Sequence, residues 1–385
     1  MKKLAIATGL GMFAAAAHAQ SSVTLYGLLD AGVSYVNHAA TPSGGSASKV
    51  KLDDGVIQGN RWGIRGTEDL GGGLRAIFAL EGGLSVANGT ASQGGALFGR
   101  QAFVGLAKEG IGSITFGRQY SLSTDYVSKY AAGGLTVGNY AFHINDVDQL
   151  TSSRINNSVK YASANFAGLT FGALYGFSNQ AGAFAGSPAS TDDGDANAGS
   201  SRTISFGANY DHGPFSVGAA YTDIRFPGTA TPAFPITIAN VNPFGNKDLR
   251  TIGAGMRYAF GPVLVFGNWT NTRFESVTNQ SSIFNNYEID GKYSVTPAFA
   301  LGLGYTYSRL AGDANGHWNQ VNSIADYLLS KRTDVYALVI YQRASGSNNG
   351  VPVQAEIGSS SSFFGNSGNG ANNQLAFRIG MRTRF

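Results

Sequence analysis

The 385-residue chain contains no cysteine. It can therefore form no disulfide bond, and it cannot bind a metal ion through thiolates. The lack of cysteine also suits a protein that is exported from the cytoplasm, where an unpaired thiol would be a hazard.

Charged residues are scarce as well. They make up 13% of the chain, about half of the ~25% that is typical of soluble globular proteins. The 27 lysines and arginines nearly balance the 23 aspartates and glutamates. Nothing resembles the single-signed basic stripe of a nucleic-acid-binding protein, so we expect no nucleic-acid partner.

Long apolar runs are missing too. A hydrophobic fraction of 43% and a mean hydropathy of −0.06 argue against a helical membrane protein. What the chain has instead is 54 glycines, 24 phenylalanines and 18 tyrosines. Few charges, much glycine and many aromatics are typical of a transmembrane β-barrel, although a soluble β-solenoid could share part of this composition.

The N-terminus has the pattern of an export signal. A basic start at Met1-Lys2-Lys3 precedes an apolar stretch from Leu4 to Ala17, and Ala17-His18-Ala19 fits the small-residue pattern of a cleavage site. The apolar stretch is too short to span roughly 30 Å of hydrocarbon. We expect residues 1–19 to be a signal peptide and residues 20–385 to form the barrel domain.

Apolar and charged side chains alternate in the last segment of the chain. Leu375, Phe377, Ile379 and Met381 share one parity, and the other parity carries three arginines, which are Arg378, Arg382 and Arg384. Successive side chains of a strand point to opposite faces. A barrel in lipid turns the apolar face outward and the charged face toward its lumen, so we expect these arginines to face the lumen.

The same alternation recurs along the chain. Apolar and polar positions alternate in the segments that begin near Ile204, Ile252, Tyr287 and Leu301. Val335 to Tyr341 alternates poorly, so that strand is placed by spacing alone.

Tight and long connections predict the number of strands. Seven tight turns rich in Gly or Pro lie at 71–73, 108–112, 167–168, 211–214, 261–262, 296–297 and 330–333. Eight long stretches lie between them, at 37–58, 88–99, 119–155, 179–201, 226–247, 274–284, 310–318 and 344–372. Strict alternation of fifteen connections predicts an all-β fold, a 16-stranded antiparallel transmembrane β-barrel. Such a sheet must close in lipid and encloses an aqueous lumen.

Six segments carry a family resemblance, and the likeness covers nearly all of residues 20–385. They are Ser22 to Val36 (SVTLYGLLDAGVSYV), Arg61 to Leu74 (RWGIRGTEDLGGGL), Gly99 to Gly105 (GRQAFVG), Ile111 to Gln119 (IGSITFGRQ), Val159 to Phe171 (VKYASANFAGLTF) and the terminal Arg-Phe. These segments resemble Gram-negative outer-membrane general porins of the betaproteobacterial type, as in Neisseria and Burkholderia.

The resemblance implies a location, an activity and partners. It implies a homotrimer in the outer membrane of a Gram-negative bacterium, in contact with lipid and lipopolysaccharide. It also implies passive passage of small hydrophilic solutes and ions through a water-filled pore. Phe385 resembles the C-terminal signal that the outer-membrane assembly machinery reads.

Residues 119–155 form the longest connection, between the fifth and sixth expected strands. A connection of this length in a compact domain is usually functional or disordered. It carries Asp125, Asp146 and Asp148 among several aromatic residues, which suggests packing against the inner wall. The resemblance implies an inward-folded third loop that narrows the pore, but the family's Pro-Glu-Phe element is absent here, which leaves the acidic side of the constriction undetermined.

Basic residues are predicted on the opposite wall. Arg61 and Arg65 point inward because Trp62 and Ile64 take the lipid parity, and Lys160 points inward by the same argument. Parity does not decide for Arg100, where the resembling porins have a basic wall residue. Arg118, which belongs to a second Gly-Arg-Gln motif at the loop entrance, is a further candidate.

Wall cations that face loop carboxylates would set up a field across the pore, orienting polar solutes and sorting ions by sign. We expect mild anion preference or little selectivity. The alternative is that these charges only satisfy one another.

No catalytic constellation stands out. The chain has no nucleophile elbow, zinc-protease motif or phosphate-binding loop. Its five histidines are isolated, and His143 is interpreted as an ordinary loop residue. Asp192, Asp193 and Asp195 are interpreted as a solvated loop tip rather than a cation site. We expect no enzyme activity, cofactor or metal ion. A substrate-specific channel on the same barrel and an adhesive barrel remain as alternatives.

Overall fold

The computed structural model describes residues 22–177, 202–225, 247–276, 279–358 and 364–385. The predicted signal peptide and the three aspartates at positions 192, 193 and 195 lie outside these residues. What we expect of them therefore stays a prediction.

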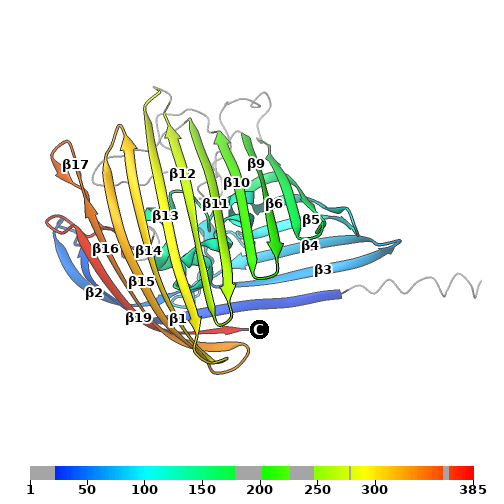
Figure 1. Cartoon of the computed structure of the whole chain (residues 1–385), viewed down its shortest axis with the longest axis horizontal. Helices are drawn as coiled ribbons and strands as arrows, with labels where there is room; N and C mark the ends of the chain where they lie inside the picture. Colours follow the sequence, from blue (N-terminus) through cyan, green and yellow to red (C-terminus); the bar gives the residue numbers. More distant parts are fainter. Residues whose placement is uncertain (1–21, 178–201, 226–246, 277–278, 359–363) are drawn as a thin grey trace, which may run out of the picture.

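Seventeen strands belong to one antiparallel sheet in this part of the chain (Figure 1). They are β1 (Ser22–Ala40), β2 (Ser46–Asp54), β3 (Arg61–Gly71), β4 (Leu74–Gly83), β5 (Gln101–Lys108), β6 (Gly112–Tyr120), β7 (Arg154–Ser163), β8 (Leu169–Gly176), β9 (Arg202–His212), β10 (Phe215–Arg225), β11 (Asp248–Phe260), β12 (Val263–Glu275), β13 (Ser281–Ser294), β14 (Phe299–Gly312), β15 (Gly316–Leu328), β16 (Thr333–Ser345) and β19 (Asn373–Arg384). The short strands β17 (Ser347–Asn348) and β18 (Val351–Pro352) pair with each other.

The sheet closes on itself. β1 pairs with β19 from Leu28 opposite Arg384 to Val36 opposite Ala376. β3 pairs with the first part of β1 and β2 pairs with its second part, so these two strands are halves of one crossing that is interrupted at 55–60. Counting them as one crossing reduces seventeen strands to sixteen, and the predicted 16-stranded antiparallel barrel is confirmed.

All seven predicted tight turns join consecutive strands, but the strict alternation with long loops is wrong. The stretch 37–58 contains the end of β1, a turn at 41–45 and the whole of β2. Only residues 313–315 connect β14 to β15, and only 276–280 connect β12 to β13. Polar and glycine-rich composition alone cannot separate a loop from the end of a strand that projects beyond the apolar part of the barrel.

The predicted alternation is confirmed where the sequence shows it clearly. In β19, Ile379 is 58% exposed and its neighbour Arg378 is fully buried. Tyr336, Leu338 and Ile340, in the poorly alternating segment, are lumen-facing and buried. They belong to an apolar cluster that also includes residues from outside the strands, among them Val56, Ile57, Val137 and Ile357. Segments packed on the inner wall therefore explain why that strand carries apolar residues on both faces.

Residues 121–153 connect β6 to β7 and contain most of the helical turns of the fold. These are α2 (Leu122–Tyr126), η2 (Ser128–Tyr130), α3 (Ala132–Leu135), η3 (Gly138–Ala141) and η4 (Ile144–Asp146), and a further turn, η1 (Gln93–Gly95), lies between β4 and β5. The Ser121 side chain caps α2 by accepting a hydrogen bond from the backbone N–H of Thr124, at 3.4 Å. None of the helices in the described ranges is long and apolar enough to cross a membrane.

Candidate pore and its lining

Lumen-facing glycines lie beneath the connection 121–153. Each leaves no room for a side chain, because a Cβ atom built on it would meet atoms of this connection at 3.2 Å or less. At Gly255, for example, that Cβ would lie 2.6 Å from the Cβ of Tyr130. The glycines that share this property are Gly172, Gly207, Gly218, Gly253, Gly255 and Gly302, and we call them the glycine track. Their small size lets the connection approach the strands closely.

Polar groups hold the connection at the same wall. The backbone N–H of Leu122 donates to Ser205 Oγ at 3.0 Å. The hydroxyl of Tyr130 hydrogen-bonds to Ser216 Oγ at 2.6 Å, and its carbonyl accepts from Asn268 Nδ2 at 3.2 Å. These partners come from β9, β10 and β12, so contacts far apart in sequence fix this part of the connection.

His143 forms a charged anchor at the centre of the connection. Its Nδ1 lies 2.5 Å from Asp148 Oδ2 and its Nε2 lies 2.9 Å from Glu288 Oε2 on β13. Asp148 also accepts a hydrogen bond from Thr270 Oγ1 at 2.6 Å. Burial alone would lower the pKa of His143, but the two carboxylates outweigh it and raise this pKa well above its usual value. The imidazole is therefore positively charged at neutral pH, which shows that His143 is not an ordinary loop residue.

The far end of the connection contacts the interruption between β2 and β3. The backbone N–H of Asn139 donates to the Val56 carbonyl at 2.6 Å, and its Nδ2 donates to the Gly55 carbonyl at 2.7 Å. The hydroxyl of Tyr140 hydrogen-bonds to Ser34 Oγ at 2.7 Å and to Asp53 Oδ2 at 2.5 Å. The connection therefore touches both β9–β13 and the crossing next to β1.

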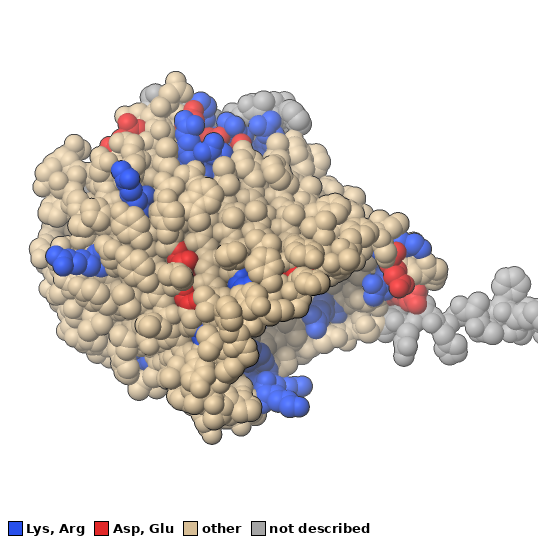
Figure 2. Space-filling view, in the orientation of Figure 1, with Lys and Arg blue, Asp and Glu red and all other residues tan. Residues whose placement is uncertain are grey.

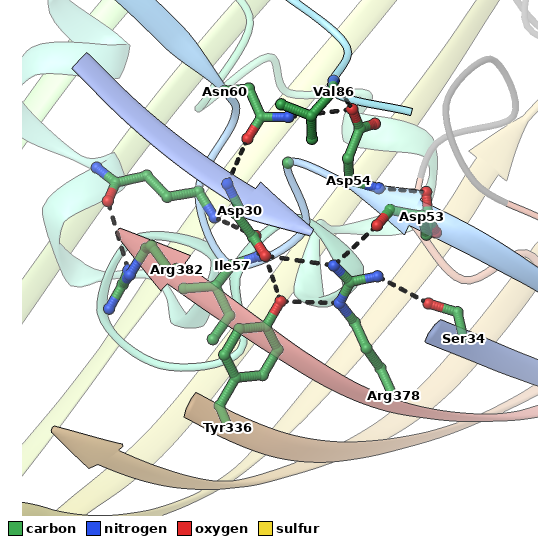
Figure 3. A network of polar contacts seen from close by, with 12 residues as sticks. Asp30, Ser34, Asp53, Asp54, Ile57, Asn60, Val86, Tyr336, Arg378 and Arg382 are labelled. Carbon is green, nitrogen blue, oxygen red and sulfur yellow. Dashed lines mark hydrogen bonds and ion pairs between the residues drawn. The ribbon is translucent and has the colours of Figure 1, made fainter. Parts of the chain in front are cut away.

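A buried ion-pair network joins the two ends of the chain (Figure 3). Arg378 Nη2 lies 3.3 Å from Asp30 Oδ1, Nε donates to the Tyr336 hydroxyl at 2.8 Å, and Nη1 donates to Ser34 Oγ at 3.0 Å. Asp30 also accepts from the backbone N–H of Ile57 at 2.6 Å. The side chain of Arg378 is completely covered and joins the strands through these contacts.

Four arginines gather on the opposite wall, and we call Arg61, Arg65, Arg100 and Arg154 the arginine cluster. Arg61 and Arg100 both approach Gly59, where a Cβ would lie 4.0 Å from Arg61 Nη2 and 3.3 Å from Arg100 Nη1. The Arg154 charge acts on Arg61 as well.

Glu81 is the one carboxylate that contacts the arginine cluster among the described ion pairs. Arg100 Nε donates to Glu81 Oε1 at 2.7 Å, and the Tyr26 hydroxyl donates to Glu81 Oε2 at 3.0 Å. Arg65 lies 5.2 Å from the centre of the Tyr26 ring. This wall therefore carries an excess of positive charge.

Comparison with known proteins identifies the family to which this barrel belongs. A sequence model described as Gram-negative porin matches residues 5–347 of this chain. The chain belongs to the Gram-negative porin family. Outer membrane porin protein 32 of Delftia acidovorans is 31% identical to this porin over 87% of the chain and 88% of that protein. An outer membrane porin protein of Bordetella pertussis is 37% identical over 58% of this chain, an alignment that spans 60% of that protein.

Solved structures agree with this assignment. An anion-selective porin from Comamonas acidovorans superimposes with a TM-score of 0.73 and 26% identity, covering 95% of this porin and 100% of that chain. OmpT of Vibrio cholerae, at 16% identity, shares the fold with a TM-score of 0.66 over 96% of this porin and 100% of that chain. This porin is an outer-membrane channel for passive diffusion, and its relatives are channels rather than enzymes.

The structure brings three of the five predicted wall cations together. Arg61, Arg65 and Arg100 all belong to the arginine cluster. Lys160 lies elsewhere on the wall, where its Nζ pairs with Asp125 and donates to the Tyr120 carbonyl at 3.1 Å.

Arg118 does not join the arginine cluster. It lies opposite Ala102, on the face that carries the exposed side chains of Ile114 and Phe116, and its Nε donates to the Gly99 carbonyl at 2.8 Å. The prediction that it lines the pore is wrong, because the parity of Ile114 and Phe116 already directs it outward.

Of the predicted loop carboxylates, two are buried inside the connection. Asp146 and Asp148 are 5% and 2% exposed, and the Ser152 hydroxyl donates to Asp146. Burial, and then the charge of Asp148, raise the pKa of Asp146 to about 7. Asp125 is the most accessible carboxylate of the three, with 32% of its side chain exposed.

The two remaining arginines of the last strand are tied to a wall carboxylate. Arg382 Nη2 and Arg384 Nη1 lie 3.1 and 3.4 Å from the two carboxylate oxygens of Asp334. Both lie near the rim that carries the tight turns, and that they line the lumen stays a prediction.

Sequence reasoning missed three features of the lining. Arg154 shares the parity of Lys160 in the sequence, but β7 carries an extra residue between Ile155 and Ser158 where its register with β6 shifts, so parity alone could not place it. The glycine track was visible as glycines alternating with apolar residues. The segment after β18 was not: Gln354 O accepts from Trp318 Nε1 at 2.9 Å, and Glu356 Oε2 accepts from Asn145 Nδ2 at 3.0 Å.

No metal centre adds to this description. Within the part of the chain that the structure describes, no group of three or more histidine, aspartate or glutamate side chains is arranged to hold a metal ion.

Proposed function

We propose that the arginine cluster is the selectivity element of this porin and gives it a mild anion preference. The observation that carries the proposal is a group of four guanidinium groups in which Glu81 is the one carboxylate that the described ion pairs place. Guanidinium stays protonated beside other cations, so the excess charge is permanent. Charges that line a narrow pore sort ions by sign. The anion-selective porin of Comamonas acidovorans supports the same direction.

We also propose that residues 121–153 are the inward-folded third loop, and that this loop narrows the pore. Its hydrogen bonds to Ser205 and Glu288 on one side, and to Ser34 on the other, support the proposal. A segment held at both sides of a closed barrel reduces its free cross-section. Asp125 and Lys160 then add one opposite pair to the lining.

General diffusion fits the lining better than a substrate-specific channel. Arg100 is bound to Glu81, and Arg378 is covered by its own partners. The arginine cluster therefore acts on passing ions through its electric field. It does not present a set of hydrogen-bonding groups that matches one particular solute. The alternative is an adhesive barrel without a pore, and flux measurements distinguish it from a diffusion channel.

The assembly we propose is a homotrimer in contact with outer-membrane lipid and lipopolysaccharide, with residues 1–19 removed as a signal peptide. We further propose that Phe385 is the assembly signal. Its ring is 52% exposed and occupies the space over Gly27, where a Cβ would clash with it. Backbone hydrogen bonds of 3.1 Å join these two residues in both directions.

Reversal potentials across a planar bilayer in a KCl gradient test the selectivity element. We expect the wild type to favour chloride, and the double variant Arg61→Gln/Arg100→Gln to shift toward potassium. The expected shift is roughly fivefold in permeability ratio, since a charge at about 4 Å in water contributes ~1 kcal/mol. Arg332→Gln, in the exposed turn after β15, is the matched control. Strong cation selectivity in the wild type, or an unshifted double variant, would contradict the proposal.

Liposome swelling against sugars of graded size tests the pore itself. Flux that falls with sugar size supports general diffusion, and no size-dependent flux would overturn it. Three equal conductance steps per inserted unit support the homotrimer, whereas single steps count against it.

A further inference from the structure

Residues 353–358, between β18 and β19, lie inside the barrel, and we call them the inner segment. The backbone N–H groups of Glu356 and Ile357 donate to Gln342 Oε1 at 2.6 Å and to Gln374 Oε1 at 2.8 Å. These two glutamines are buried side chains on the inner faces of β16 and β19, close to the rim where the long connections begin. The inner segment therefore occupies the interior of the barrel near that rim.

Apolar contacts hold both ends of the inner segment. Val353 belongs to the buried cluster that includes Trp318 and Ala344 of the wall. Ile357 belongs to the second buried cluster, which includes Val137 of the connection 121–153. The inner segment is therefore packed against the wall and against this connection at the same time.

The side chain of Glu356 lies between these two contacts. Its Oε2 accepts a hydrogen bond from Asn145 Nδ2 of the connection 121–153 at 3.0 Å, and its Oε1 has no hydrogen-bond partner among the described residues. Only 3% of Glu356 is exposed. Burial of an ionised carboxylate without a cation costs far more free energy than burial of the neutral acid. The position therefore favours the protonated carboxyl.

Carboxylates elsewhere at this rim have cations beside them. Asp248 lies 2.7 Å from Arg225 Nη1, and Glu275 lies 2.6 Å from Lys247 Nζ. Figure 2 shows acidic and basic side chains gathered together near the upper edge of the barrel. Glu356 differs from these carboxylates, because no cation of the described residues pairs with it.

The elements packed against Glu356 bring no charge to it. On the connection 121–153, the nearby titratable residues are His143 and Asp146, which pair with other groups of this connection and of β13. On the wall, Gln342 and Gln374 are uncharged. Burial raises the pKa of Glu356 to about 8, opposed only by its single amide hydrogen bond. The carboxyl is therefore protonated at neutral pH and ionised at alkaline pH.

We propose that Glu356 is a pH-sensitive latch. Its protonated carboxyl holds the inner segment against the connection 121–153, and its ionisation releases the inner segment and widens the pore at that rim. The proposal deepens the proposed function by adding a control of the same pore, and it rests on that function.

The direction of the pH effect follows from proton binding. A released Glu356 has the ordinary pKa of 4.5, whereas the docked side chain has a pKa of about 8. The released form binds fewer protons between these two values, so docking is fully favourable below the lower value and weakens as the pH rises through the range. The ratio of released to docked protein can increase up to about tenfold per pH unit, and it levels off above the higher value.

Labelling of a single cysteine in the inner segment measures its release, since the chain itself contains no cysteine. Val353→Cys places the thiol at a side chain that is 1% exposed, and a buried thiol behaves as a small apolar group. A polar thiol reagent should react faster with the full-length mature protein as the pH rises. Because thiolate formation also increases with pH, each rate is divided by that of Val353→Cys/Glu356→Gln, whose side chain at 356 is neutral at every pH.

We expect this ratio of rates to rise from about pH 5, by up to about tenfold per pH unit, and to level off above about pH 8. Asp313→Asn in the Val353→Cys background is the matched control, because Asp313 is an exposed carboxylate in the connection 313–315 at the same rim. It should leave the pH profile unchanged. All of these variants keep His143, so titration of that residue affects them alike.

A ratio that stays constant with pH overturns the latch. An Asp313→Asn variant that reacts as slowly as Glu356→Gln at every pH overturns it too. If Glu356→Gln does not fold, as judged by heat-modifiable migration, Ser43→Cys in the exposed turn 41–45 corrects for thiolate formation instead. A corrected rate that is independent of pH is then the contradicting result.

Single-channel conductance tests the consequence for the pore. It should rise with pH over the same range in the wild type and stay constant in Glu356→Gln. Constant conductance in both proteins, with a labelling ratio that rises, would overturn the widening of the pore. Absence of any conductance at all, with the same rising ratio, would contradict the proposed function and support the latch.

Discussion

The two sides of the lumen are built by different means. Along β8 to β14, the wall carries glycines, hydrogen-bonding side chains and the carboxylate of Glu288, and the third-loop segment (residues 121–153) lies on them. Along β3 to β7, the wall carries the arginine cluster with Glu81. We propose that residue size and the His143 anchor position the segment on one side, and that residue charge acts on ions on the other. Substitutions on the two sides should therefore change different measured quantities.

The largest effect is expected at His143, which links the segment to the glycine side. His143→Gln leaves Asp148 and Glu288 without the cation between them, and removing one partner of a buried ion pair costs about 3–5 kcal/mol. We expect frequent conductance fluctuations at neutral pH in single-channel recordings. His38→Gln, a partly buried histidine at the end of β1, is the control. Quiet channels in His143→Gln would mean that other contacts suffice to hold the segment.

The wild-type protein should show the same conductance fluctuations only at alkaline pH. Because the pKa of His143 is raised on folding, its contribution is fully present below the ordinary value of 6.5 and is lost as the pH rises through the raised value. Recordings from neutral to alkaline pH should therefore show fluctuations that begin in the alkaline range. Fluctuations that do not depend on pH would contradict a protonated anchor.

A smaller effect is expected from the glycine track. Gly255→Leu would place its Cβ 2.6 Å from that of Tyr130, and overpacking costs typically ~1–3 kcal/mol. Displacement of the segment should raise the sugar size limit in liposome swelling, with ion selectivity almost unchanged. Gly291→Leu is the control, since no atom lies within 4 Å of its added Cβ. An unchanged size limit would show that the track does not set the position of the segment.

The smallest effect is expected on the charged side, at Glu81. Glu81→Gln removes the one acid of the cluster, so the preference for chloride should increase, by roughly fivefold at most from a contribution of ~1 kcal/mol. Reversal potentials in a KCl gradient measure the change. Glu68→Gln, an exposed residue near the tight turn of β3, is the control. A shift toward potassium would mean that Glu81 does not act on ions in the pore.

The sequence predicted what depends on neighbouring residues. Side-chain alternation and turn composition act over a few positions, so the crossings, the tight turns and the inward parity of Arg61 and Arg65 could be predicted. The anchor could not, because His143 and Glu288 lie 145 positions apart. The same holds for the interruption at 55–60, whose partners Asp30 and Asn139 come from β1 and from the third-loop segment.

Apolar residues on the inward face of β16 interrupt the alternation of apolar and polar side chains. Tyr336, Leu338 and Ile340 made β16 look irregular, yet they pack against segments that cover the wall from inside. A strand that departs from alternation thus indicates what covers it. No rule based on one strand can say which segment that is.

The Arg378 network implies that closure of the barrel is a late step of its folding. Arg378 and Asp30 are 348 positions apart, and their pairing is part of the join between the last strand and the first. The ribosome synthesises Asp30 long before Arg378. β1 and β19 therefore cannot pair, and the barrel cannot close, until translation is nearly complete. A chain without β19 would keep unpaired strand edges on β1 and β16, and Asp30 would lose Arg378 as its ion-pair partner.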